Sequence, residues 1–409
     1  MNYYSNKKKI VNDPVHGFIS ISHNLFHDII EHPYFQRLRR IKQLGLTHLV
    51  YPGAMHTRFH HALGAMFLMD EALKILRQKK IDISSKEIKA AKAAILMHDI
   101  GHGPFSHALE HSIVSKISHE EISLLFMQRL NQIFEGKLSD SIQIFSGEYP
   151  KKFLSQLIAG QLDVDRLDYL RRDSFYTGVS EGVIGTQRIL KMLHVVDDCL
   201  AVEQKAIYSI DHFLNSRRIM YWQVYLHKTV LSAEFTLINI LKLARELVRS
   251  GRQLFATPAL DFFLRSEISH EDFLHHDEPL QLFAKLDDFD ILSAIKVWTD
   301  DSNPTLSDLC NRIINRKLLK IELSDNPFPQ DRIDDLKNNL KSVIGFTTEH
   351  PEFYVFSGIT ENQTYNNGKD SIKFLLKNGT LVDLSEVSDQ WKTGNGQLFS
   401  RKFYLCYPV

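Results

Sequence analysis

The sequence is poor in cysteine. Of 409 residues only Cys199, Cys310 and Cys406 are cysteines, and they lie far apart without any CxxC pair. This spacing offers no disulfide framework, which favours a reducing, cytoplasmic location. An excess of either charge is also missing, because 49 Lys and Arg residues balance 49 Asp and Glu residues. A general electrostatic attraction to nucleic acid or to a membrane surface is therefore not expected.

Long apolar runs are absent as well. The first residues, MNYYSNKKKI, lack the apolar stretch of a secretory signal, and no segment approaches membrane-spanning length. We therefore expect no membrane partner. The hydrophobic share of 44% is ample for a sizeable buried core in one large unit with an appendage.

Apolar residues at helical spacing dominate the first three quarters of the chain. Pro33 suits a helix start and Gly45 a position just past a helix end, so one helix is expected between them. Further helices are predicted over 59–78, 86–99, from about Ser106, over 161–173 and over 210–250. A short strand is predicted over 18–22 and a small hairpin within 194–209.

The composition changes after about residue 315. Strand-like segments occur over 318–323, 353–358 and 371–384, with a helix expected over 329–343. Asn378-Gly379 is typical of a hairpin turn. We predict a mainly α protein, with a helical body over 1–310 and a smaller α+β appendage over 311–409.

The segment MHDIGHGPFSHALEH (97–111) carries the most chemical information. His98 follows Ala91, Ala94 and Ile95 at helical spacing, so it is expected on the buried face of its helix, with Asp99 beside it. A buried carboxylate is costly unless it is paired or bound to a metal. An imidazole and a carboxylate at one helix end suit Fe, Mn, Zn, Ni or Co better than Ca.

A metal needs more ligands than this pair provides. His61 lies in a predicted helix whose apolar side includes Ala65 and Leu68. Asp165 shares one helical face with Tyr169 and Asp173. A single buried histidine is more often a hydrogen-bonded core residue than a ligand, but the order H…HD…D within helical segments is much more specific.

The chain resembles the HD-domain deoxynucleoside triphosphate triphosphohydrolases, the family of the human SAM-and-HD-domain enzyme and its bacterial relatives. The matching segments run in family order: NDPVHG (12–17), FQRLRRIKQLG (35–45), YPGAMHTRFHHALG (51–64), MHDIGHGPFSH (97–107), SHEE (118–121), DVDRLDYLRRD (163–173) and YLHK (225–228). The resemblance implies an HD-domain catalytic body with its metal motifs over 50–180. It also implies one divalent transition metal per site, with Mg as a further ion on the substrate phosphates. The metal ligands it implies are His61, His98, Asp99 and Asp165.

Residues for catalysis and substrate binding follow from the same resemblance. Spacing alone places His107, Glu110 and His111 on one helical face, with His119 soon after, and a carboxylate beside a histidine orients it and raises its pKa. The resemblance implies that the acid-base and water-positioning group is His107, Glu110 and His119. On the phosphate side it implies Arg58, His102, Arg217 and Lys228, and Tyr221 replaces a histidine of the human enzyme. On the deoxyribose side it implies Gln43, Tyr169, Asp173 and Tyr225.

Regulation and assembly are implied by the family as well. Its members form homo-oligomers, often dimers or tetramers, with GTP or dNTP effectors at subunit contacts. The matching positions here are Asn12, Asp13, Glu31, Gln36 and Arg39. A solvated helix face or a protein interface explains Gln36, Arg39 and Arg40 equally well.

The resemblance implies hydrolysis of a deoxynucleoside triphosphate to a deoxynucleoside and inorganic triphosphate. Two alternatives stay open at this point. One is an HD phosphatase that acts on nucleoside monophosphates or cyclic nucleotides, since the metal quartet alone does not exclude it. The other is a nucleic-acid-binding regulatory module with a vestigial metal site, which the neutral net charge disfavours.

Overall fold

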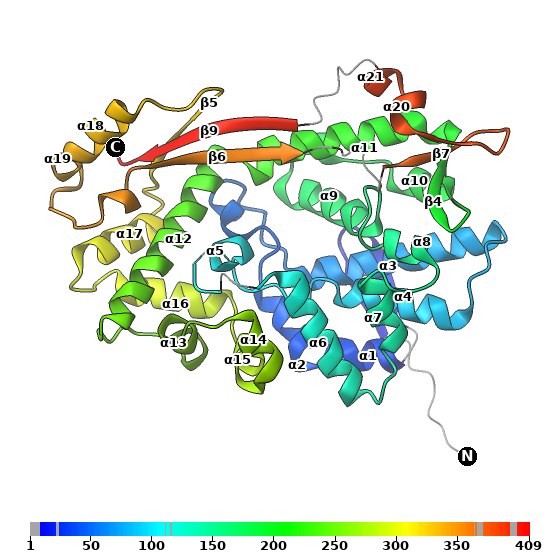
Figure 1. Cartoon of the computed structure of the whole chain (residues 1–409), viewed down its shortest axis with the longest axis horizontal. Helices are drawn as coiled ribbons and strands as arrows, with labels where there is room; N and C mark the ends of the chain where they lie inside the picture. The colour runs from blue at the N-terminus through cyan, green and yellow to red at the C-terminus, as the bar shows by residue number, and fades with distance from the viewer. Residues whose placement is uncertain are drawn as a thin grey trace.

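The protein is mainly α-helical, with strands concentrated in the C-terminal region (Figure 1). The structure is a computed structural model, and it describes residues 9–21, 24–110, 112–114, 117–363, 365, 371–392 and 399–409. Within this part of the chain, no helix is both long and apolar enough to cross a membrane. The predicted fold class is confirmed.

The helices fall into two groups along the chain. Those of the first half are α1 (Asn24–Glu31), α2 (Pro33–Gln36), α3 (Arg58–Gln78), α4 (Ser85–Met97), α5 (Ser106–Glu110), α6 (His119–Ile133), α7 (Ser139–Phe145), α8 (Lys152–Gln156), α9 (Val164–Thr177) and α10 (Thr186–Met192). Those of the second half are α11 (Ile207–Met220), α12 (Lys228–Arg249), α13 (Pro258–Arg265), α14 (His270–His275), α15 (Asp277–Phe283), α16 (Asp288–Trp298), α17 (Pro304–Ile314), α18 (Gln330–Asn338), α19 (Leu340–Ile344), α20 (Leu384–Val387) and α21 (Asp389–Lys392).

In the part of the chain that the structure describes, the strands form three small sheets. An N-terminal hairpin pairs β1 (Lys9–Asp13) with β2 (Gly17–Ile21). A second sheet has the order β3 (Leu193–Val196), β4 (Cys199–Glu203), β7 (Lys373–Leu375) and β8 (Leu381–Asp383). A third has the order β5 (Lys320–Ser324), β9 (Phe399–Tyr407) and β6 (Phe356–Gln363). The predicted hairpins at 194–209 and at Asn378-Gly379 are both present.

Helix α3 is the centre of the body, because it packs against both α4 and α9. Its start is fixed by a capping box in which His60 Nδ1 accepts a hydrogen bond of 3.2 Å from the Thr57 N–H. Helix α4 begins with a second box, where Ser84 and Glu87 cap each other. Helix α9 is capped at its start by Asp163, whose carboxylate accepts from the Arg166 N–H at 2.7 Å. These caps determine where each helix starts, and they therefore determine the positions of the metal-facing residues on the three helices.

The prediction of one helix between Pro33 and Gly45 is wrong for the second half of that segment. Helix α2 ends at Gln36, a 3-10 turn spans Arg37–Arg40, and Ile41 has an extended backbone. Tertiary hydrogen bonds explain the change, since the Lys42 N–H donates to Asp288 and the Arg58 N–H donates to the Ile41 carbonyl. The long-range partners outweigh the local helical pattern.

The C-terminal segments are attached to the body by direct pairing. Strand β7 extends the β3–β4 sheet by pairing in parallel with β4, and β5 packs against α12. Figure 1 shows β6 and β9 side by side along the top of the helical body, where they pair as antiparallel strands. The predicted boundary between residues 310 and 311 falls inside α17. The division into body and appendage stays a prediction.

Gly64 allows α3 and α9 to approach closely. A Cβ at this position would come within 2.0 Å of the Asp168 carboxylate and 2.1 Å of the Arg172 guanidinium. Both of these side chains are completely buried and paired with each other. They therefore have no room to withdraw without breaking their ion pair.

We predict that Gly64→Ala lowers the free energy of unfolding by about 2–4 kcal/mol, because the added methyl displaces a buried ion pair. Urea denaturation measures this loss. Gly185→Ala is the matched control, since a Cβ there meets nothing within 4 Å. Equal stability of the two variants would contradict the close approach of α3 and α9.

Candidate active site

Three helices bring the four predicted metal ligands together. His61 lies in the first turns of α3, His98 and Asp99 directly follow α4, and Asp165 lies in the first turn of α9. The His61 Nε2 atom is 3.3 Å from His98 Nε2, 3.8 Å from an oxygen of Asp99 and 3.0 Å from one of Asp165. His98 Nε2 is 3.3 Å from Asp99 and 3.4 Å from Asp165.

The outer nitrogens of both imidazoles are already engaged. His98 Nδ1 lies 2.6 Å from the Ile95 carbonyl, to which it must donate a proton. His61 Nδ1 lies 2.8 Å from the Asp168 carboxylate and donates to it. Each neutral ring therefore turns the lone pair of its Nε2 toward the same point. Two lone pairs that face each other across 3.3 Å repel unless a cation lies between them.

The donor set fits a divalent transition metal. Two ligands at right angles on a metal with bonds of about 2.1 Å lie about 3 Å apart, close to the separations seen here. Ligand atoms of His61, His98 and Asp99 lie within 4.8 Å of one another, and all three residues are buried. Mixed imidazole and carboxylate ligands suit the first-row transition metals. The group can hold one ion, and the assignment of Asp165 as its fourth ligand stays a prediction.

The charges around His61 also require a cation. Burial alone would lower the pKa of His61, but hydrogen bonds to Asp165 and Asp168 outweigh burial and raise that pKa to about 10. A proton therefore takes the central position when no metal does. Metal binding must displace this proton.

A buried network behind His61 holds its ring in place. Asp168 accepts from His61, and it also pairs with Arg172 at 2.8 Å and with His16 at 2.6 Å. Arg172 in turn donates to Asp13 at 2.7 Å. Sequence reasoning missed the roles of His16, Asp168 and Arg172, although the i,i+4 spacing of Asp168 and Arg172 was a signal for an ion pair.

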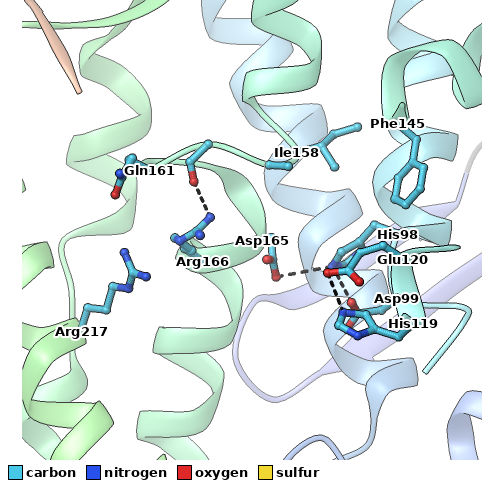
Figure 2. A pocket seen from close by; sticks show the side chains of 12 residues that line it. His98, Asp99, His119, Glu120, Phe145, Ile158, Gln161, Asp165, Arg166 and Arg217 are labelled. Atoms are coloured by element: carbon cyan, nitrogen blue, oxygen red, sulfur yellow. Dashed lines mark hydrogen bonds and ion pairs between the residues drawn. The ribbon is translucent and has the colours of Figure 1, made fainter. Parts of the chain in front are cut away.

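A cavity of about 450 Å³ opens beside the ligands (Figure 2). His98, Asp99 and Asp165 form one side, while Arg166 and Arg217 lie on the other. Arg166 was not identified from sequence, since its place in the cavity depends on how α9 is oriented. Its guanidinium pairs with Asp163 and the Gly160 carbonyl. The cavity therefore offers positive charge close to the metal ligands.

Two further phosphate-side residues have different surroundings. Arg58 is buried and donates to Asp99 at 2.5 Å, so it lies directly beside the ligands. Lys228 is exposed at the start of α12. It lines neither this cavity nor the cavity beside Gln43 and Tyr225.

Histidines flank the ligand group near the cavity mouth. His102 Nε2 is 3.3 Å from Asp99, and its ring stacks on that of His119 with centroids 3.8 Å apart. Burial and the nearby Arg58 charge hold the pKa of His102 well below its usual range, so the ring is neutral. His119 Nε2 is 3.2 Å from Glu120, a carboxylate that sequence reasoning did not select. The side chains of His107 and Glu110 lie outside the described residues, so their predicted roles stay predictions.

Two of the four predicted sugar-side residues, Gln43 and Tyr225, line a second cavity of about 390 Å³, whereas Tyr169 and Asp173 are not among its lining residues. Arg58 and Tyr221, which were predicted on the phosphate side, also line it. The Tyr225 hydroxyl donates to Asp173 at 2.7 Å, and the Tyr169 and Tyr225 rings meet edge to face.

His56 completes this group. Its Nε2 lies 2.7 Å from the second Asp173 oxygen, and its ring stacks on Tyr176. Sequence reasoning missed His56, because nothing in the segment links it to a carboxylate 117 positions away.

The predicted effector residues are largely engaged within the chain. Arg39 donates to Gln36 at 2.9 Å, and its guanidinium lies 3.6 Å above the Phe59 ring. Glu31 pairs with Lys9, and Asp13 is buried against Arg172. Asn12 is exposed on β1. The effector role of these residues stays a prediction.

Comparison with known proteins supports the same chemistry. The model of the HD domain family matches residues 58–173, a range that contains all four predicted ligands. A crystal structure of a phosphohydrolase from Bacteroides thetaiotaomicron is 51% identical, with a TM-score of 0.95 over 98% of this chain and 100% of that one. The uncharacterised protein YwfO of Bacillus subtilis is 35% identical over 93% of this chain and 88% of its own length.

A more distant relative has a named activity. The deoxynucleoside triphosphate triphosphohydrolase SAMHD1 homologue of Dictyostelium discoideum is 34% identical over 275 residues, or 61% of this chain. This chain spans about half of that relative, 52% of its length.

We predict that His61→Gln abolishes metal retention, because the amide replaces a neutral imidazole that is held by Asp168. Metal content of the purified protein, measured by plasma mass spectrometry, checks this. His60→Gln is the matched control, since its neighbouring ring only caps α3 and glutamine also serves that role. Full metal occupancy in His61→Gln would rule out the ligand assignment.

Proposed function

Because this chain belongs to the HD-domain phosphohydrolases, we propose that it hydrolyses deoxynucleoside triphosphates at the α-phosphorus. The products of this reaction are a deoxynucleoside and inorganic triphosphate. The observation that carries the proposal is the pair of imidazole lone pairs that face one point beside a cavity lined by Arg166 and Arg217.

The arginines match the charge of the proposed substrate. A triphosphate brings about four negative charges, which need cations besides one metal ion. Arg58, Arg166 and Arg217 lie around the ligand group and carry a fixed positive charge. Arg58 and Arg166 are held in place by Asp99 and Asp163. A triphosphate has more phosphate oxygens to contact these three arginines than a nucleoside monophosphate or a cyclic nucleotide has. The arginines therefore favour a triphosphate over these alternative substrates.

The reaction also needs an activated water and a proton for the leaving oxygen. A bound divalent metal supplies the first, by lowering the pKa of a coordinated water and polarising a phosphoryl oxygen. His119, stacked on neutral His102 and paired with Glu120, is placed at the cavity to move a proton. His107 and Glu110 remain candidates for the same role through the family resemblance.

The sugar side provides the proposed selectivity for deoxyribose. Asp173 is held from both sides by His56 and Tyr225, so its position is fixed before substrate arrives. It can still accept a hydrogen bond from a 3′-hydroxyl, because each carboxylate oxygen has two lone pairs. Tyr169 packs between His61 and Tyr225 and would block a 2′-hydroxyl.

The second alternative, a nucleic-acid-binding module, has less support. The net charge is zero, and the arginines described above turn inward to the site rather than forming an exposed basic surface. Assembly into a homo-oligomer and activation by GTP or a dNTP remain part of the proposal.

We predict that the metal-loaded protein releases inorganic triphosphate and deoxynucleoside from dNTPs, with little turnover of ATP. Anion-exchange chromatography of the products, with GTP added and omitted, checks both the reaction and its activation. The metal-stripped protein is the control. Pyrophosphate with dNMP, or stepwise release of orthophosphate, would refute attack at the α-phosphorus.

A further inference from the structure

Glu234 lines the second cavity, and its carboxyl has no role in the proposed chemistry. It lies on α12 between Leu231 and Leu237, one turn to either side, and all three residues line the cavity. Its carboxyl faces the turn at Gly45, where an added Cβ would lie 4.0 Å from Glu234 Oε1. Phe105 closes the same side of the cavity.

No hydrogen bond or ion pair joins Glu234 to any other residue in the part of the chain that the structure describes. Glu234 is half-buried and lines the cavity, and a carboxyl that is withdrawn from bulk water without a partner points to a ligand. The Gln43 Oε1 atom in the same cavity is likewise buried without a hydrogen bond within the described chain. One cavity of mostly apolar walls therefore contains the half-buried Glu234 carboxyl and the unsatisfied Gln43 amide oxygen.

Contacts between wall residues link the two cavities. Arg58 lines the second cavity and donates to the ligand Asp99. Arg217 lines the first cavity and lies 5.7 Å above the ring of Tyr221, which lines the second. Tyr225 joins the second cavity to Asp173. A nucleotide with its phosphates beside the metal and its sugar at Asp173 would place its base in the second cavity.

We propose that Glu234 reads the base of the bound deoxynucleotide and selects guanine. Guanine presents two adjacent donors, N1–H and the N2 amino group, which both donate to one carboxylate. Adenine and cytosine place a ring-nitrogen lone pair beside their amino group, and thymine places two carbonyl oxygens beside N3–H. A carboxylate repels each of these acceptors. The inference rests on the proposed function, because it needs a nucleotide in this orientation.

The selectivity depends on the charge of Glu234. Burial raises the pKa of Glu234 to about 7. The other titratable groups that line the cavity are Lys42, Arg58, Tyr221 and Tyr225. Above pH 7 the carboxylate accepts from guanine, whereas below pH 7 the neutral acid can donate to N1 of adenine and accept from its amino group. The preference for guanine over adenine therefore rises with pH.

The test measures kcat/KM of the metal-loaded enzyme for the four dNTPs and for deoxyinosine triphosphate, which lacks the N2 amino group. We expect the wild type to prefer dGTP at pH 8, and the ratio of dGTP to dATP to fall as pH decreases to 6. Glu234→Gln should lower this ratio at least tenfold at pH 8, roughly the effect of an unpaired polar group in a site built to bond it. It should also remove the discrimination against deoxyinosine triphosphate.

Glu246→Gln is the matched control, because this exposed residue lies on the same helix away from the cavity. Its ratios should equal those of the wild type. The pH profile of the wild type needs no variant, so it tests the inference even if Glu234→Gln folds poorly. Equal efficiency for all four bases, or a ratio that is independent of both pH and Glu234, would overturn the inference.

The outcomes separate this inference from the proposed function. Release of triphosphate without base preference overturns only the role of Glu234. A guanine preference that depends on Glu234, with dNMP and pyrophosphate as products, supports that role and overturns only the proposed reaction. Failure to bind or hydrolyse any dNTP overturns both.

Discussion

Asp168 is the buried carboxylate on which the geometry of the site depends. It accepts hydrogen bonds from His61, His16 and Arg172 at once, and each of these partners belongs to a different part of the chain. Its ionised form therefore ties α3, α9 and the segment after β1 together. Because it accepts the hydrogen bond from His61 Nδ1–H, it also leaves the lone pair on Nε2 and turns it toward the other ligands. Carboxylates that accept a hydrogen bond from a metal-ligating histidine orient its ring at metal centres in general.

The same arrangement explains why the site needs a cation. The carboxylates of buried Asp99 and half-buried Asp165 lie beside the lone pairs of two buried imidazoles. Arg58 offsets part of this negative charge through its bond to Asp99. Arg166 is engaged with Asp163 at the cavity wall, so its position is fixed before any phosphate binds. Preorganised charge of this kind favours a polyanionic substrate without large rearrangement.

Part of this site could be predicted from the sequence alone. His98 and Asp99 follow a run of alanines at helical spacing, and family order singled out His61 and Asp165. The structure brings these four side chains together as expected. The hairpin at Asn378-Gly379 was also predictable, because its turn residues determine it locally.

Other features depend on contacts between distant segments. The bond between His56 and Asp173, and the approach of Glu234 to Gly45, join elements that only tertiary packing brings together. The helix expected up to Gly45 ends early for the same reason, since the Asp288 carboxylate, 246 residues away in the chain, accepts a hydrogen bond from the Lys42 N–H. Local patterns cannot encode such partners, whereas they encode caps and turns well.

We propose that water attacks the α-phosphorus beside the His61–His98 pair. Hydrolysis of a dNTP in water enriched in oxygen-18, followed by mass spectrometry of both products, tests this directly. We expect the label to enter inorganic triphosphate and the deoxynucleoside to carry none, because the bond from phosphorus to the 5′ oxygen breaks. Label in the deoxynucleoside, or in a dNMP released with pyrophosphate, would contradict it.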